Sequence, residues 1–381
     1  MTIVESLQTQ INSVISLYSN GQIQEALDSV EVLIKDYPNE ALLYNVSGAC
    51  YAGLGQLDTA VNLYEQALAI KPDYAEAHNN LGITLKDLGQ LDDAVKSYEQ
   101  ALAIKPDFAE AFNNLGSVLN ELGQLDTAVK SYEKILANKP DFAEAHYNLG
   151  VTFQGLDRLD DAVKSYEQAL AIKPDYADAH YNLGLTLHEL GQLDDAVKSY
   201  EQALAIKPDF AEAHNTLGSV LKELGQLDAA LKSYEQALAI KPDFAEAHNN
   251  LGIALNGLGQ LNAALKSYEQ ALAIKPDYAE AHNNLGIALQ DLGQLDAAVK
   301  CCKQALAIKP DFAEAHNNLG NALKDLGQLD DAVKSYEQAL AIKPDFAEVH
   351  NNLGIALKGL GQLDAALKSY EQALAIKPDY A

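Results

Sequence analysis

Prolines occur in this sequence at one fixed spacing. The chain has eleven prolines in 381 residues, and each lies 34 residues after the one before, from Pro38 to Pro378. Self-similarity at a period of roughly 20–50 residues indicates a repeat array and not two or three independent globular domains. The period predicts a degenerate capping repeat in an N-terminal segment, residues 1–40, followed by ten full repeats over residues 41–380.

The composition excludes several kinds of partner. Twenty-seven basic against fifty-four acidic side chains give a formal net charge of −27, which repels nucleic acid phosphates. No apolar run approaches the roughly 18 residues of a membrane span, and the first residues, MTIVESLQTQ, lack the basic flank and apolar core of a secretion signal. Three cysteines are too few for a disulfide framework. We therefore expect a cytoplasmic protein with no nucleic acid or membrane partner.

Each repeat predicts two antiparallel helices. In residues 75–108, numbered here as positions 1 to 34, Asp73-Tyr74-Ala75-Glu76 is typical of a capping box that begins the first helix. Gly89 at position 15 ends this helix, because a backbone of positive φ is needed there. Pro106 at position 32 ends the second helix, since proline cannot continue it. One such hairpin cannot bury its apolar stripes alone, so neighbouring hairpins are expected to stack.

The two faces of the first helix are distinguished by a rotation of about 100° per residue. Ala77, Leu81 and Leu85, at positions 3, 7 and 11, form the predicted buried side. The predicted exposed arc carries positions 2, 5, 6, 9, 12 and 13, which are Glu76, Asn79, Asn80, Ile83, Lys86 and Asp87.

The repeat resembles the tetratricopeptide repeat family. The resemblance rests on the 34-residue period with Leu81, Gly82, Ala94, Tyr98, Ala101 and Pro106 at positions 7, 8, 20, 24, 27 and 32. It implies an all-α, right-handed superhelical solenoid of about eleven antiparallel helical hairpins. It also implies that the first helices line a concave surface, which in this family usually holds an extended peptide or a partner helix. The function expected on this basis is a protein–protein interaction scaffold.

Position 6 carries asparagine in most of the repeats. The row consists of Asn80, Asn114, Asn148, Asn182, Asn250, Asn284, Asn318 and Asn352. A carboxamide offers both donors and an acceptor, which is what a peptide backbone requires. The row resembles the asparagine ladder in the repeat arm of O-linked N-acetylglucosamine transferases. The competing interpretation is a polar residue that is merely tolerated in nearly identical repeats.

Other candidate groove residues lie at positions 9 and 12. His188 and Lys222 at position 12 are predicted partner contacts. Ile253 and Ile287 at position 9 either form a shallow apolar floor or pack against the next repeat. Acidic residues at positions 2 and 13 make this surface negative, so we expect a neutral or basic partner.

Nothing in the sequence has the pattern of a catalytic or cofactor site. Eight histidines share position 4, one in each of eight repeats, and helices that pack about 8–10 Å apart do not bring them together around a metal, so they are interpreted as structural. Cys302 occupies the tyrosine position and should be buried, whereas Cys301 should be exposed. We expect a protein without cofactor or metal that is not an enzyme.

Two alternative functions remain open. Arrays of nearly identical repeats resemble those that precede glycosyltransferase or sulfotransferase domains, so the chain is alternatively a substrate-docking arm of a larger enzyme. The last hairpin, with Leu367 and Leu374, lacks a polar closing helix, which favours a homo-oligomer formed by end-to-end stacking. Irregular residues over 135–158 also predict a local change of stacking.

Overall fold

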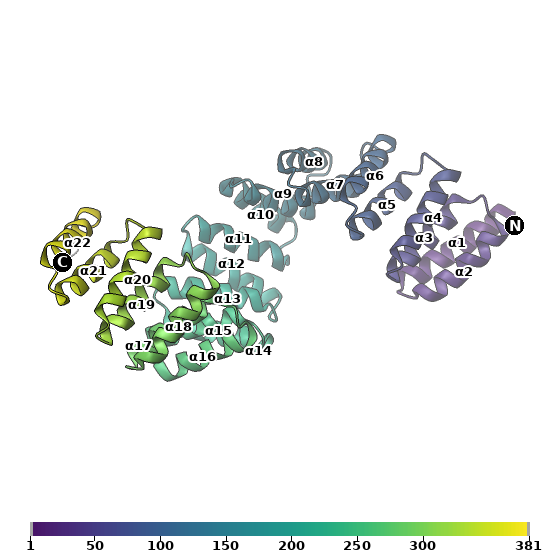
Figure 1. Ribbon diagram of the computed structural model, residues 1–381. Coiled ribbons are helices and arrows are strands. Elements are labelled where there is room, and N and C mark those ends of the chain that lie inside the picture. The colour runs from purple at the N-terminus through teal and green to yellow at the C-terminus, as the bar shows by residue number, and fades with distance from the viewer. Residues whose placement is uncertain (1–2, 379–381) are drawn as a thin grey trace. The chain divides into compact units, whose positions relative to one another are not determined.

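The computed structural model describes residues 3–378, and this part of the chain consists of α-helices joined by short turns (Figure 1). Residues 1–2 of the N-terminal segment and residues 379–380 of the last predicted repeat lie outside the described residues. The chain divides into two compact units, one up to Gln192 and one from Leu193. The described helices number twenty-two, two for each predicted repeat, which confirms the all-α solenoid.

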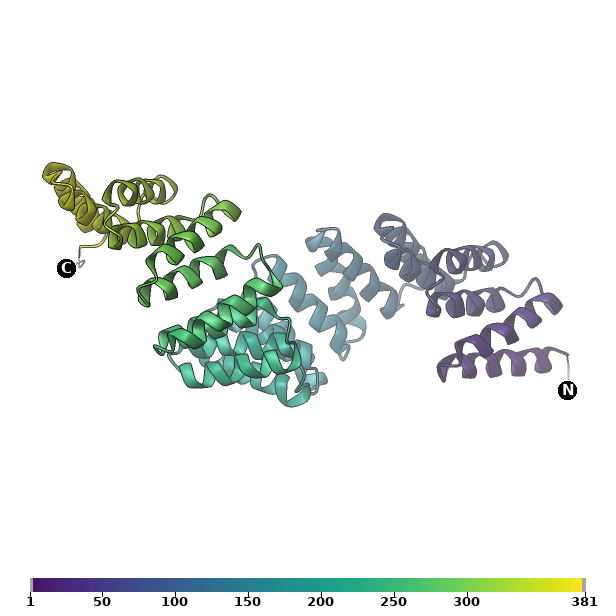
Figure 2. The ribbon, with the colours of Figure 1, turned by 60° about the horizontal axis from the view of Figure 1, so that its bottom comes forward.

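The first unit contains α1 (Ile3–Ser19), α2 (Ile23–Asp36), α3 (Ala41–Gly53), α4 (Leu57–Ile70), α5 (Ala75–Asp87), α6 (Leu91–Ile104), α7 (Ala109–Glu121), α8 (Leu125–Asn138), α9 (Ala143–Gly155), α10 (Leu159–Ile172) and α11 (Ala177–Glu189). The second contains α12 (Leu193–Ile206), α13 (Ala211–Glu223), α14 (Leu227–Ile240), α15 (Ala245–Gly257), α16 (Leu261–Ile274), α17 (Ala279–Asp291), α18 (Leu295–Ile308), α19 (Ala313–Asp325), α20 (Leu329–Ile342), α21 (Ala347–Gly359) and α22 (Leu363–Ile376). Figure 2 shows the helical hairpins of each unit from a second direction.

The turn inside each hairpin follows from its glycine. Gly89 has φ +75°, and its N–H donates to the carbonyl of Lys86 at 2.8 Å. The N–H of Gln90 donates to the carbonyl of Leu85, also at 2.8 Å, so the last carbonyls of α5 are satisfied before α6 begins at Leu91. Asp157 takes the place of this glycine in one repeat and keeps the left-handed backbone, with φ +58°.

The predicted capping box is wrong. The residue before α5 is Tyr74, and no side chain caps the helix start. Glu76 does not reach back, because its Oε1 lies 3.3 Å from Nζ of Lys105 at the end of the following helix. Lys71, the residue that follows α4, lies over the Tyr74 ring at 5.0 Å. The N-cap position of α5 is therefore occupied by an aromatic residue whose ring lies beneath a lysine side chain.

In nine of the ten full repeats the interior of the hairpin contains a tyrosine at position 24. Tyr98 is fully buried between Ala94 and Ala101, which are also fully buried. A Cβ added to Gly82 would lie 2.6 Å from the Tyr98 ring. Position 8 is therefore glycine because an aromatic ring, and not another helix backbone, occupies the space beside it.

Stacking within each unit places the first helices side by side. Each second helix packs against the first helix of the next repeat, and neighbouring first helices also touch, as α5 does α7 in one unit and α15 does α17 in the other. The asparagine row and the other groove candidates therefore share one face of each unit, which we call the first-helix face. No helix within residues 3–378 combines the length and apolarity that a membrane crossing requires.

Candidate functional site

The asparagine row is connected by hydrogen bonds that cross from one repeat to the next. Nδ2 of Asn80 donates to Oδ1 of Asn45 at 3.1 Å, and Nδ2 of Asn284 donates to Oδ1 of Asn249 at 3.0 Å. Asn182 donates to the hydroxyl of Tyr147 at 2.9 Å. The same bond between position 6 and position 5 of the preceding repeat is made at 2.9–3.1 Å by Asn114, Asn148, Asn250, Asn318 and Asn352.

Position 5 is buried in most of these pairs, so its predicted place on the exposed arc is wrong. Asn79 is only 7% exposed, and Asn249, Asn283 and Asn317 are buried as well. Position 5 lies at the seam between neighbouring first helices, where the next repeat covers it. The signal in the sequence was its uniformity, since every full repeat has asparagine or tyrosine there.

The position-6 asparagines themselves are half-buried. Within the described residues, their side chains use one amide hydrogen for the bond across the seam. A carboxamide has two amide hydrogens and two acceptor lone pairs. Each asparagine of the row therefore keeps one donor and its acceptor oxygen, in an orientation that the bond across the seam holds.

The acidic residues at position 2 are partly neutralised by lysines of the same chain. Nζ of Lys241 lies 3.1 Å from Oε1 of Glu212, and Lys105 pairs with Glu76 in the same way. Backbone hydrogen bonding at the start of α13, together with Lys241, holds the pKa of Glu212 below its usual value. These pairs are exposed to solvent, so each contributes little to stability. Their main effect is to reduce the negative charge of the first-helix face.

Side chains at position 12 reach across to the following repeat. Nζ of Lys86 lies 2.7 Å from Oε1 of Glu121 and donates to Oγ of Ser117 at 2.9 Å. Gln290 donates to Oδ2 of Asp325 at 2.6 Å. The two candidates at position 12 are His188 on α11 and Lys222 on α13. They occupy the same position of their repeats as Lys86 and Gln290, and both are half-buried. Variation at position 12 therefore changes the contacts between repeats as well as the surface.

Residues at position 9 are partly buried between repeats and partly exposed. Ile253 packs against a buried cluster that includes Leu285 and Ala288 of the next repeat, and Ile287 is half-buried. Ile83 and Ile355 are 38% and 43% exposed. The position contributes to the contact between repeats and leaves an apolar edge on the first-helix face.

The histidines at position 4 each bind the chain's own backbone. Nε2 of His78 lies 3.1 Å from the carbonyl oxygen of Pro72, and the seven other histidines of this row make the same contact. A carbonyl can only accept, so Nε2 carries the proton. The hydroxyl of Tyr44 donates to Pro38 in the same way. The described residues contain no group of histidine, cysteine and acidic side chains that could hold a metal.

The predicted exposure of Cys301 is wrong. Cys301 is 9% exposed and belongs to a buried cluster with Tyr268 and Leu285, because position 23 packs within the hairpin and against its neighbour. Cys302 is buried as expected, at 1% exposure. Burial raises the pKa of both thiols, that of Cys302 to about 12. Neither is a thiolate at neutral pH, which makes a redox function unfavourable.

Comparison with known proteins agrees with the repeat assignment. Models of the TPR repeat match in nine overlapping segments from residue 48 to residue 361, and a tetratricopeptide repeat model matches residues 347–380. None of the curated proteins compared with this chain matches it.

Solved structures of similar fold include the Cut9–Hcn1 hetero-tetramer of the APC/C, at 14% identity, TM-score 0.54, 100% coverage of this chain and 94% of that one. The pilus biogenesis factor PilW is similar at 29% identity and TM-score 0.50, over 54% of this chain and 94% of that one. MamA matches 42% of this chain and 95% of its own at 28% identity and TM-score 0.39. Since the family models match nearly the whole array, the chain belongs to the tetratricopeptide repeat family, whose members are scaffolds for protein–protein interaction.

Proposed function

We propose that the first-helix face binds an extended peptide segment of a partner protein through the asparagine row, and that the chain itself is not an enzyme. The observation that carries the proposal is the bond across the seam, which orients each position-6 side chain and leaves a donor and an acceptor unused. Side chains that are already fixed lose little rotamer freedom when they bind a partner.

The spacing of the row suits an extended chain. Neighbouring first helices are expected about 8–10 Å apart, and an extended peptide advances about 3.3 Å per residue. Each asparagine would therefore meet the backbone of about every third peptide residue. Contacts made only to the backbone do not select peptide side chains, so the row supplies affinity, and positions 9 and 12 supply the selectivity.

The charge of the face favours a neutral or basic segment. Within the described residues no ion pair engages Asp87, Glu189 or Asp291 at position 13, in a chain whose net charge is −27. Acidic side chains without partners attract a basic peptide, and salt reduces that attraction.

The experiment uses two triple variants that remove the same three hydrogen bonds from opposite sides. Asn250→Ala, Asn284→Ala and Asn318→Ala remove the donors, whereas Asn215→Ala, Asn249→Ala and Asn283→Ala remove the acceptors. Both should lose stability, by about 0.5–1.5 kcal/mol for each bond. The first should lose capture of a displayed library of random peptides. The second keeps the three asparagines and loses only the bonds that orient them, so it should capture more weakly than the unmodified chain but better than the first. Equal capture by both variants, or equal loss, would contradict the proposal.

The exposed leucines of α22 favour a second candidate, the stacking of two copies. Leu363, Leu367 and Leu374 are 65%, 58% and 47% exposed, whereas equivalent leucines of the preceding repeats are half-buried. Sedimentation should then show a mass that rises with concentration and falls to that of one chain in the Leu367→Glu variant. A constant mass in the unmodified chain would exclude it.

A further inference from the structure

One repeat, residues 109–142, differs from the other full repeats at four positions. Phe112 replaces histidine or tyrosine at position 4, and Lys134 replaces glutamine at position 26. Ile135 replaces alanine at position 27, and Asn138 replaces isoleucine at position 30. No other full repeat departs at any of these four positions.

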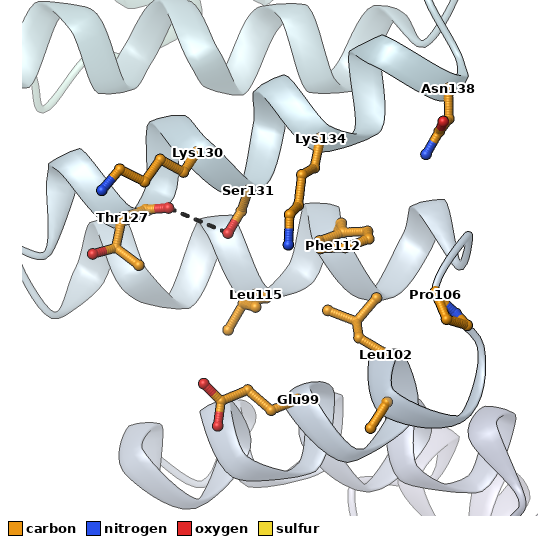
Figure 3. Close-up of a pocket in the computed structure, with 11 residues that line it drawn as sticks. Glu99, Leu102, Pro106, Phe112, Leu115, Thr127, Lys130, Ser131, Lys134 and Asn138 are labelled. Atoms are coloured by element: carbon orange, nitrogen blue, oxygen red, sulfur yellow. Dashed lines mark hydrogen bonds between the residues drawn. The ribbon is translucent and has the colours of Figure 1, made fainter.

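All four of these residues line two pockets that share residues. The larger, of about 720 Å³, lies between α6, α7 and α8, and Phe112, Lys134 and Asn138 line it (Figure 3). The smaller, of about 420 Å³, is lined by Phe112, Ile135 and Asn138. Substitutions that are scattered over 27 residues of sequence thus meet in one place, which we call the third-repeat pocket.

The substitutions explain why the space is open in this repeat. In nine other full repeats, a histidine or Tyr44 ties position 4 to the preceding proline carbonyl. Phe112 has no polar atom to bind Pro106, and both residues line the pocket instead. Ile135, only 2% exposed, fills a place where the other repeats have a fully buried alanine. The contact between α7 and α8 is also less extensive than that between the two helices of the neighbouring hairpins, as expected when a larger side chain is placed in a packed core.

The pocket has an apolar floor and a basic wall. Leu102 and Pro106 lie on the side opposite α8, and Phe112 and Leu115 lie between them and the side chains of α8 (Figure 3). Lys130, Lys134 and Asn138 follow one another at intervals of four residues, so they lie along one face of α8. At 1.5 Å per residue this wall is about 12 Å long. The space is a trough that can accept a short peptide segment.

The charge of the trough is opposite to that of the protein. Two lysines, Lys130 and Lys134, face one glutamate, Glu99. Neither lysine forms an ion pair within the described residues, whereas Lys96 at the position equivalent to Lys130 pairs with Asp93 at 2.7 Å. Thr127 is the residue equivalent to Asp93, so the aspartate that pairs with the lysine in the preceding repeat is replaced by threonine here.

The next repeat shows the contrast. The residues equivalent to Glu99, Thr127, Lys130 and Lys134 are Glu133, Asp161, Lys164 and Gln168. Lys164 and Arg158 face two acids there, since Lys164 lies 3.5 Å and Arg158 2.6 Å from Asp161. Of these two repeats, only the third therefore has an excess of positive charge at this place.

We propose that the third-repeat pocket is a second binding site, which takes an acidic segment of a partner protein. The segment inserts one or two large apolar side chains between α6 and α8 and sets its carboxylates against Lys130 and Lys134. None of the lining residues belongs to the asparagine row, so the site is separate from the first-helix face and takes a partner of opposite charge.

The experiment compares the full chain with a variant whose third repeat is returned to the common pattern. Phe112→His, Thr127→Asp, Lys134→Gln, Ile135→Ala and Asn138→Ile each introduce a residue that other repeats already have at that position. This variant is therefore expected to fold, which its helicity and melting check. A displayed library of random peptides is selected on the full chain and counter-selected on the variant.

The expected pool is rich in aspartate and glutamate beside leucine or phenylalanine. Individual peptides should bind at least about tenfold more weakly to the reverted variant and to Lys130→Glu/Lys134→Glu, and their affinity should fall with salt. Lys164→Glu, in the next repeat, should leave their affinity unchanged. The Asn250→Ala, Asn284→Ala and Asn318→Ala variant should also bind them normally, which separates this site from the proposed groove. Failure to obtain such peptides, or equal binding to the reverted variant, would overturn the proposal.

Discussion

The contact between Gly252 and Tyr268 allows a quantitative test of how each hairpin is built. In Gly252→Ala the new Cβ would lie 2.5 Å from the Tyr268 ring, which is itself 2% exposed. Carbon atoms in contact are normally about 3.5–4.0 Å apart, and overpacking of a core costs about 1–3 kcal/mol. A rigid ring that is buried on all sides places the cost in the upper part of this range, about 2–3 kcal/mol. Alanine is more favourable than glycine inside a helix by about 1 kcal/mol. We therefore expect Gly252→Ala to lower the free energy of unfolding by about 1–2 kcal/mol.

The chain contains its own control. At Gly286 the nearest atom to an added Cβ is Sγ of Cys302, at 2.9 Å. The thiol belongs to a short side chain that can rotate, and the other near atom is the carbonyl oxygen of Ala298 at 3.3 Å, so Gly286→Ala should cost at least about 1 kcal/mol less than Gly252→Ala. The background variant Tyr268→Cys should likewise remove most of the cost of Gly252→Ala, which a double-mutant cycle measures.

Native-state hydrogen exchange is the suitable assay, because repeat arrays do not always unfold in two states. The amides of α15 and α16 report on Gly252, and those of α17 and α18 report on Gly286. If Gly252→Ala is as well tolerated as Gly286→Ala, the tyrosine ring is not the reason for glycine at position 8.

Four further predictions concern single positions. Asp157→Gly should stabilise the chain by about 0.5–1 kcal/mol in urea unfolding, because Asp157 holds φ +58° where the other repeats have glycine. Tyr98→Phe should be neutral or stabilising, since the buried hydroxyl of Tyr98 has no partner. Tyr336→Phe should cost about 0.5–1.5 kcal/mol, because its hydroxyl donates to Asn321 at 2.8 Å. Burial raises the pKa of Cys50 from 9.0 to about 11, so its contribution to stability is present below pH 9.0 and is lost as the pH rises toward 11. Cys50→Ala should accordingly make the alkaline fall in the urea midpoint less steep.

The features predicted correctly are those that depend on the backbone of one repeat. A glycine at position 15 and a proline at position 32 restrict φ whatever their neighbours are, so the helix ends could be read from one repeat of sequence. The capping box failed because Glu76 had a better partner, Lys105, which lies 29 residues later in the sequence. A local pattern carries no information about that competition.

The errors at positions 5 and 23 have a different cause. A helical wheel places Asn79 on the exposed arc of its own helix, yet the next repeat covers it. Burial in an array is decided partly by the neighbouring repeat, which a single-helix analysis omits. Cys301 was misplaced for the same reason, since residues of more than one repeat surround it.

In an array of nearly identical repeats, the residues that differ from the common pattern are the ones that indicate a function specific to one repeat. Histidine at position 4 recurs because its bond to the proline carbonyl stabilises each of the eight repeats that contain it in the same way, so the row carries no information about a particular partner. Phe112 gives up that bond, and Ile135 places a larger side chain where the other full repeats have a buried alanine. Each change alone is expected to cost stability. Random drift would scatter such changes over the repeat, whereas these meet around one pocket beside two lysines without acidic partners. A local loss of stability together with a new pocket is what a binding site produces, and this favours function over drift in the third repeat.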